Sequence, residues 1–200
     1  MDKTMCKQCA AENVTMYMVN LEHSREFLAD KPHRKFLDLA GVYRWKEGCS
    51  LETAGEPVTL QQMRELGLTE EELFEKAMKN IDENYEFICF GQSINDFTNI
   101  IVSTSTVCVT NRDTYWGSGA MMSRNIMNRL AARFNSDVMI MPSSVHELIV
   151  CIYHGEPEEI EYMKAAVRCI NSDPSTVPPE IWLSDNVYLF RRDTQEVTIA

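Results

Sequence analysis

The sequence has few basic side chains. Its 200 residues include 19 lysines and arginines against 30 aspartates and glutamates, which gives a formal net charge of −11 at pH 7. Because polyanions repel a chain of this charge, we expect neither direct nucleic-acid binding nor binding to anionic membrane surfaces. The same excess of negative charge makes a protein with a basic surface the expected partner.

Long apolar segments are also missing. The longest strictly apolar run, Leu148 to Tyr153, has six residues, whereas a helix that spans a bilayer needs about 20. The first residues, from Met1 to Cys6, contain no apolar stretch of the length found in signal peptides. We therefore expect a cytoplasmic protein that does not enter a membrane.

Glycine and proline are scarce, with eight and seven residues, which excludes collagen-like and linker-like chains. Hydrophobic residues make up 44% of the chain, too many for a wholly disordered protein. The length suits one domain with a core of its own. Since residues 1–20 show no clear hydrophobic period, we expect a loose N-terminal segment there and a single α+β domain over residues 21–200.

Hydrophobic periodicity predicts an α+β fold, with a mainly antiparallel sheet packed against a few amphipathic helices. Capping boxes begin two short helices at Thr59 and Thr69, and Gly67 is placed to end the first. A short turn at Pro142–Ser144 forces the strands on either side of it to pair antiparallel. The other predicted helical segments are Ser24–Ala29, Met121–Phe134 and Glu158–Ile170, and the predicted strands are Phe36–Trp45, Thr106–Thr110, Val138–Met141, Val145–Tyr153 and Val187–Arg191.

The sequence contains no complete metal or cofactor motif. Cys6 and Cys9 have the spacing of zinc ligands, but the second pair that such a site needs is missing. They are either incidental thiols or part of a small zinc- or thiol-dependent protein. The glycines of Gly117-Ser118-Gly119 either hold an anion at a helix start or supply an ordinary loop. Phosphate-loop and dinucleotide patterns do not occur, and we expect no cofactor.

One polar cluster contains the residue types of a hydrolase. Ser143, Ser144, His146 and Glu147 follow Pro142, and a serine nucleophile needs a base within hydrogen-bond reach. In a strand, Ser144 and His146 would share one face while Glu147 points to the other, so a triad does not form locally. The alternative to catalysis is a turn whose hydroxyl groups bond to backbone amides, followed by a half-buried strand.

Four segments carry a family resemblance, and they lie at Pro32–Ala40, Gly67–Leu73, Met141–Ile149 and Leu183–Tyr188. Together they are similar to a bacterial family of unknown function that is common in anaerobic gut bacteria and their mobile elements. The resemblance covers roughly residues 20–195. It implies a shared fold and no catalytic residues. It also implies that this chain lacks the family's further N-terminal region, with residues 1–20 as a remnant or replacement.

The negative charge is concentrated in two segments. Residues 51–100 hold 3 basic and 11 acidic residues, and residues 151–200 hold 4 basic and 9 acidic residues. Their predicted helices contain the candidate partner-binding residues Glu70, Glu71, Glu75, Glu158, Glu159 and Glu161. A single partner surface requires both helices to lie on one side of the molecule.

We therefore expect a non-enzymatic, acidic binding protein. The resemblance to a family of mobile elements suggests a sharper version, an inhibitor of a bacterial nucleic-acid-processing defence enzyme of the anti-CRISPR or anti-restriction type, whose basic channel the acidic groups would occupy. Two alternatives remain open at this point. One is a hydrolase that uses Ser144 and His146, and the other is the zinc- or thiol-dependent protein that uses Cys6 and Cys9.

Overall fold

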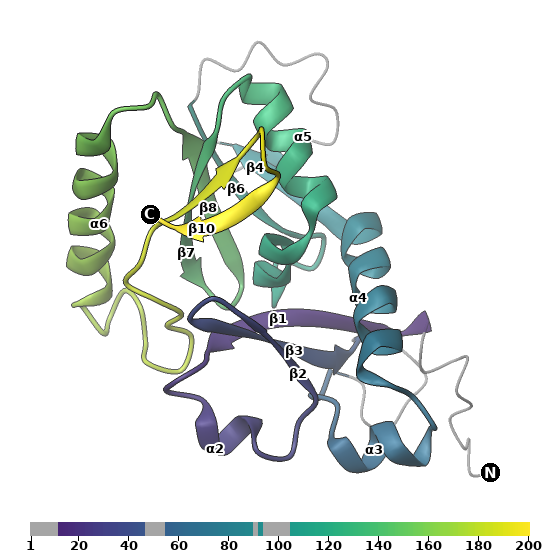
Figure 1. The fold of residues 1–200 in the computed structure, drawn as a ribbon. Helices are drawn as coiled ribbons and strands as arrows, with labels where there is room; N and C mark the ends of the chain where they lie inside the picture. Colours follow the sequence, from purple (N-terminus) through teal and green to yellow (C-terminus); the bar gives the residue numbers. More distant parts are fainter. Residues whose placement is uncertain (1–11, 47–54, 90–91, 94–104) are drawn as a thin grey trace.

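The computed structural model describes residues 12–46, 55–89, 92–93 and 105–200, and two antiparallel sheets share one core in it (Figure 1). The smaller sheet has the strand order β1-β3-β2, and the larger has the order β10-β9-β7-β8-β6-β4-β5. Neighbouring strands in both sheets run antiparallel. The predicted α+β class with a mainly antiparallel sheet is confirmed.

The N-terminal strand β1 (Val14–Asn20) pairs along its full length with β3 (Leu39–Trp45). All of its residues except Thr15 are buried. The expectation of a loose segment over residues 1–20 is therefore wrong for residues 14–20. Because both faces of β1 are covered, its apolar side chains follow one another instead of alternating with polar ones, and the sequence shows no strand period.

A hairpin replaces the single strand that was predicted over Phe36–Trp45. β2 (His33–Phe36) runs back along β3, and the chain reverses at Leu37 and Asp38 so that Phe36 lies opposite Leu39. Leu37 has a φ of 58°, in the left-handed region that a leucine seldom adopts. The turn escaped prediction because tight hairpin turns are recognised by asparagine or glycine, and this one has neither.

Three helices accompany the small sheet: α2 (Arg25–Leu28), α3 (Leu60–Glu65) and α4 (Glu70–Asn84). Both predicted capping boxes are present, at Thr59 with Gln62 and at Thr69 with Glu72. Gly67, between the two helices, has a φ of +61°, as expected for a residue that ends a helix. The apolar side of α4 packs on β1.

The large sheet contains seven strands: β4 (Tyr85–Cys89), β5 (Gln92–Ser93), β6 (Thr106–Asn111), β7 (Val138–Ser144), β8 (Glu147–Ile152), β9 (Tyr188–Arg191) and β10 (Glu196–Ile199). The β7–β8 hairpin is antiparallel as predicted, but Pro142 and Ser144 belong to β7 and the turn falls at Val145 and His146. The register shifts between Met141 and Ser144. Such a bulge allows a proline within a strand.

A short 3₁₀ helix, η1 (Gly117–Met122), leads into α5 (Arg124–Phe134). The sequence predicted one helix from Met121. The α-helix instead begins after Ser123, whose hydroxyl accepts a hydrogen bond from the Ile126 amide at 3.1 Å. The η1 segment contacts both β1 and β6, so it lies between the two sheets.

The last helix, α6 (Pro157–Asn171), covers the other face of the large sheet. Figure 1 shows it by itself along the left side of the molecule, away from the small sheet and α4. A second, smaller apolar cluster lies beneath it, with buried members Met139, Cys151, Tyr153, Val167, Val187 and Leu189. No helix in the described ranges has both the length and the apolar character that crossing a bilayer requires.

Candidate functional site

Two of the candidate glutamates on α4 are bound within the chain itself. Glu70 accepts hydrogen bonds from Arg34, at 3.0 Å from Nε and 2.5 Å from Nη2, and from the hydroxyl of Tyr43. Glu71 lies 2.6 Å from the same Nη2. Burial and the Glu70 carboxylate raise the pKa of the Tyr43 hydroxyl, so Tyr43 stays a neutral donor. These carboxylates hold α4 to β2 and β3. Glu75 is exposed.

The candidate glutamates on α6 face solvent to a greater extent. Glu158 and Glu161 are exposed, and Glu161 lies 3.1 Å from Lys164. Glu159 accepts a hydrogen bond from the backbone amide of His154 at 2.9 Å and lies 2.8 Å from the imidazole Nδ1 of that residue. Exposed ion pairs of this kind contribute little to stability. The helix therefore keeps carboxylates that a partner can reach.

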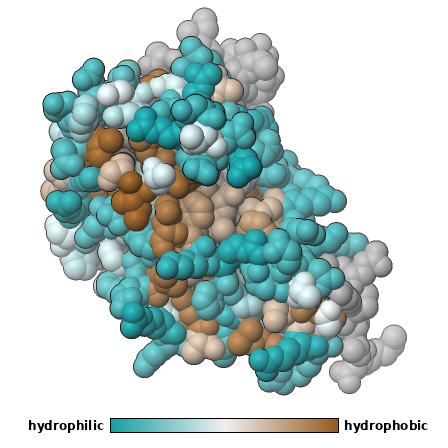
Figure 2. Space-filling view, in the orientation of Figure 1, coloured by the Kyte–Doolittle hydropathy of each residue, from teal (hydrophilic) through white to brown (hydrophobic). Residues whose placement is uncertain are grey.

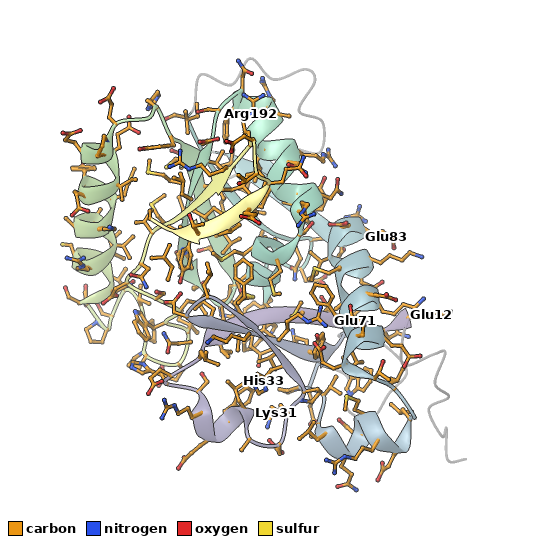
Figure 3. The ribbon with its side chains drawn as sticks, viewed as in Figure 1. Glu12, Lys31, His33, Glu71, Glu83 and Arg192 are labelled. Carbon is orange, nitrogen blue, oxygen red and sulfur yellow. The ribbon has the colours of Figure 1, made fainter. Side chains whose placement is uncertain are left out.

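The two acidic helices lie on opposite sides of the molecule (Figure 1). α4 packs on β1 of the small sheet, whereas α6 covers the far face of the large sheet. In Figure 3, Glu71 lies beside the small sheet, and Glu83 lies at the other end of α4, well away from α6. The six candidate glutamates therefore do not form a single surface, and any partner that uses them engages one helix.

The side chains of Ser144 and His146 each accept a hydrogen bond from a backbone amide. The Ser144 hydroxyl accepts the backbone amide hydrogen of His146 at 3.0 Å, and the imidazole Nδ1 of His146 accepts the amide hydrogen of Trp116 at 3.2 Å. Within the part of the chain that the structure describes, the ring and the hydroxyl are not bonded to each other. The serine–histidine hydrogen bond that a hydrolase would need is therefore not formed in this structure.

His146 belongs instead to a cluster of aromatic rings. Its imidazole centroid lies 4.2 Å from the ring of Tyr115 and 5.1 Å from that of Trp116. The indole of Trp116 also contacts Tyr17 at 4.6 Å, and Arg44 lies over it at 4.9 Å. Burial and, to a lesser extent, the Arg44 charge hold the pKa of His146 below its usual range, although Glu147 opposes the shift. The imidazole is therefore neutral at pH 7.

A small cavity opens next to this cluster, where α4, β1, β3 and residues 111–117 meet. It has a volume of about 100 Å³. Its walls include Thr15, Arg44, Lys46, Asn80 and Tyr115. Sequence reasoning missed this site because its residues come from four separate segments. The only local signal was the polar Asn-Arg-Asp sequence at residues 111–113, between a strand and a helix.

The Gly-Ser-Gly sequence before α5 serves packing. A Cβ atom at Gly119 would overlap the carbonyl oxygen of Met16, and one at Gly117 would lie 2.7 Å from the carbonyl oxygen of His146. Ser118 is fully buried. Its hydroxyl accepts the amide hydrogen of Met18 at 3.0 Å and donates to the carbonyl oxygen of Val145, in the β7–β8 turn. The glycines therefore bring η1 against the backbones of both sheets.

A second hollow is lined by both apolar and polar residues, and Figure 2 shows apolar surface between the small sheet and the β9–β10 hairpin. Its volume is about 290 Å³, and it is lined by Phe36, Met121, Met122, Arg124, Met127, Phe190, Gln195, Glu196 and Val197. Met121 and Met127 are also buried in the main core. These methionines act as flexible fillers at the edge of the core.

Cys108 and Cys151 are not reactive thiolates. Burial, with Glu147 nearby, raises the pKa of Cys108 to about 12, and burial raises the pKa of Cys151 to about 11. Cys6 and Cys9 lie outside the described residues, so a thiol or zinc role for them stays a prediction. Among the described residues, no group of three or more histidine, cysteine or acidic side chains is placed to hold a metal ion.

Comparison with known proteins gives one match. A family model described as a family of unknown function, DUF5688, matches residues 1–192. The match includes residues 1–20, which the resemblance had placed outside the shared region. No curated protein and no solved structure matches the chain. The predicted kinship with an uncharacterised family is confirmed, and the chain belongs to the DUF5688 family.

Proposed function

We propose that this protein is a non-enzymatic binding protein that docks on a basic partner through the outer face of α6. We define that face by Glu158, Glu161, Tyr162 and Cys169. The observation that carries the proposal is the exposure of a large aromatic side chain there, 72% for Tyr162. Tyrosine is enriched among the residues that contribute most to protein–protein binding.

The packing of α6 leaves this face available. Val167 is its one fully buried residue, and Ile160 and Met163 are half-buried against the sheet. These three positions share one side of the helix. Glu158 and Tyr162 are four residues apart and share the opposite side. The helix is therefore anchored by one stripe and presents a second, mixed acidic and apolar stripe to solvent.

The chemistry of the face supports a basic partner. Exposed carboxylates at Glu158 and Glu161 favour lysine and arginine side chains, and Tyr162 favours an apolar depression between them. The basic channel of a nucleic-acid-processing enzyme presents lysines and arginines of this kind, and the sharper proposal is therefore an inhibitor of a defence enzyme. Docking there would exclude nucleic acid by competition for the same cations.

Affinity capture from a lysate of the encoding organism tests the proposal, with the wild type and a Glu158→Lys/Tyr162→Ser variant as paired baits. Glu75→Lys makes the same charge change on α4 and serves as the control. We expect a partner that the wild type and the control retain and that the α6 variant loses at least about tenfold, because central tyrosines contribute at least about 2 kcal/mol.

The second measurement is the salt dependence of capture. Raising the salt concentration from about 0.1 M to about 1 M shortens the Debye length from about 10 Å to about 3 Å, so the partner should elute over this range. Equal capture by the wild type and the α6 variant would contradict the proposal. If the captured partner processes nucleic acid, addition of the wild-type protein should reduce its activity and the α6 variant should not.

A further inference from the structure

The cavity beside Trp116 concentrates positive charge in an acidic protein. Arg44 lines it from β3 with only 6% of its surface exposed, and the half-buried Lys46 follows two residues later. Among the described lining residues, Asp113 is the one carboxylate. These described residues therefore carry a net positive charge in a chain whose formal charge is −11. Charges in such a partly enclosed site act with less screening than at the open surface.

A buried amide adds an uncommitted acceptor. Asn80 on α4 is 8% exposed, and its Nδ2 donates to the carbonyl oxygens of Glu12 at 3.1 Å and Val14 at 2.7 Å. These bonds fix the orientation of the side chain. Asn80 lines the cavity, and no hydrogen bond from a described residue occupies its Oδ1. This oxygen is therefore an acceptor that a ligand in the cavity can use.

An aromatic ring stands at the rim. Tyr115 is 54% exposed, and one face of its ring rests on His146 at 4.2 Å. Asn111 holds its backbone from both sides, with Nδ2 2.6 Å from the Tyr115 carbonyl oxygen and Oδ1 3.2 Å from its amide nitrogen. Thr114 and Trp116 on either side have φ values of 56° and 62°. A β-branched residue in that region is strained, and such strain is concentrated at functional sites.

We propose that this cavity binds a small anion that carries a single flat ring. The carboxylate of the ligand lies beside Arg44 and Lys46, and its ring stacks on the free face of Tyr115. A volume of about 100 Å³ is smaller than the roughly 150 Å³ cavity that takes benzene, so the anionic group enters and the ring stays at the rim. Nucleotides are excluded, because sites for ligands of that size have about 300 Å³ or more.

This site is independent of the docking face on α6. It lies on the α4 side of the molecule, and α6 lies on the other side (Figure 1). The two proposals share no residue. Loss of partner capture with retained ligand binding, or the reverse, would identify which of them fails.

Titration with benzoate, followed by NMR of the full chain, tests the proposal. Benzamide has the same shape without the charge and serves as the matched ligand. We expect benzoate to shift the Trp116 indole signal in a saturable manner, with a Kd of about millimolar or below, and to bind at least about tenfold more tightly than benzamide.

Variants locate the site. Lys46→Met removes a cavity charge, and Tyr115→Ala removes the exposed ring; each should weaken benzoate binding at least about fivefold. Lys79→Met, on the outer side of α4 with 68% of its side chain exposed, should leave it unchanged. The proposal is overturned if benzoate produces no saturable shift, if benzamide binds equally well, or if Lys46→Met and Lys79→Met behave alike. Thermal melting of each variant confirms that it is folded before titration.

Discussion

At the scale of single residues, the close approach of two backbones determines which residue can occupy position 119. Gly119 lies where η1 meets β1, and no side chain fits there because the carbonyl oxygen of Met16 occupies the space of a Cβ atom. Ser118 beside it satisfies a buried amide of β1. The sequence flagged this tripeptide for its glycines and assigned it to a loop or an anion site. Its contact with β1 was not predictable because β1 itself was not recognised.

Replacement of Gly119 by alanine should destabilise the protein by at least about 3 kcal/mol, because the added methyl group forces η1 away from β1. Gly67→Ala is the matched control. It has a φ of +61° but no atom within 4 Å of the added Cβ, so it should cost only about 1–2 kcal/mol of backbone strain. Urea unfolding measures both. Equal losses would show that η1 accommodates the methyl group.

At the scale of elements, local signals in the sequence were reliable where local physics determines the structure. The capping boxes at Thr59 and Thr69 appear as predicted, because the bonds that form them span only three residues. The hairpin at Leu37 was missed because its turn has neither glycine nor asparagine at the position with positive φ. The strand β1 was missed because it is covered on both faces. The glutamates in the first turn of α4 are favoured by the positive end of the helix dipole. The structure adds a long-range contact between Glu70 and Arg34.

The position of α4 depends on that contact. Glu70→Ala should lower the free energy of unfolding by roughly 1–3 kcal/mol, because the buried hydroxyl of Tyr43 loses its acceptor and Arg34 loses its bidentate partner. Glu75→Ala on the same helix should change stability by no more than about 0.5 kcal/mol, since Glu75 is exposed. Chemical denaturation compares the two. If both variants unfold at the same urea concentration, the Glu70 network does not hold α4.

At the scale of the whole molecule, one carboxylate ties the small sheet to the C-terminal part of the chain. Asp38, in the β2–β3 turn, accepts hydrogen bonds from Ser184 at 2.7 Å, Asn186 at 3.0 Å and Tyr188 at 2.6 Å. Its neighbour in space, Asn20, donates to the carbonyl oxygen of Leu183 at 2.8 Å. Both ends of this tie belong to segments that carried the family resemblance, which is consistent with a structural role for them.

Asp38→Ala should lower the free energy of unfolding by roughly 2–4 kcal/mol, because three donors lose a charged acceptor and such losses are not fully additive. Asp30→Ala, at an exposed carboxylate whose ion-pair partner among the described residues is Lys31, should cost no more than about 0.5 kcal/mol. Differential scanning calorimetry should show a lower Tm for the first variant alone. An unchanged Tm would mean that apolar contacts join the two sheets without help from Asp38.

The sequence by itself determined the starts of α3 and α4, the antiparallel pairing of β7 with β8 and the α+β class, because each depends on spacing within a few residues. Only the tertiary structure decided that Glu70 and Glu71 are internal partners of Arg34, that the two acidic helices lie on opposite sides, and that Arg44, Asn80 and Tyr115 enclose a cavity. The physical reason is distance along the chain. These residues are buried and paired by segments that lie tens of residues away in the chain. Local spacing in the sequence does not indicate which of those segments come into contact.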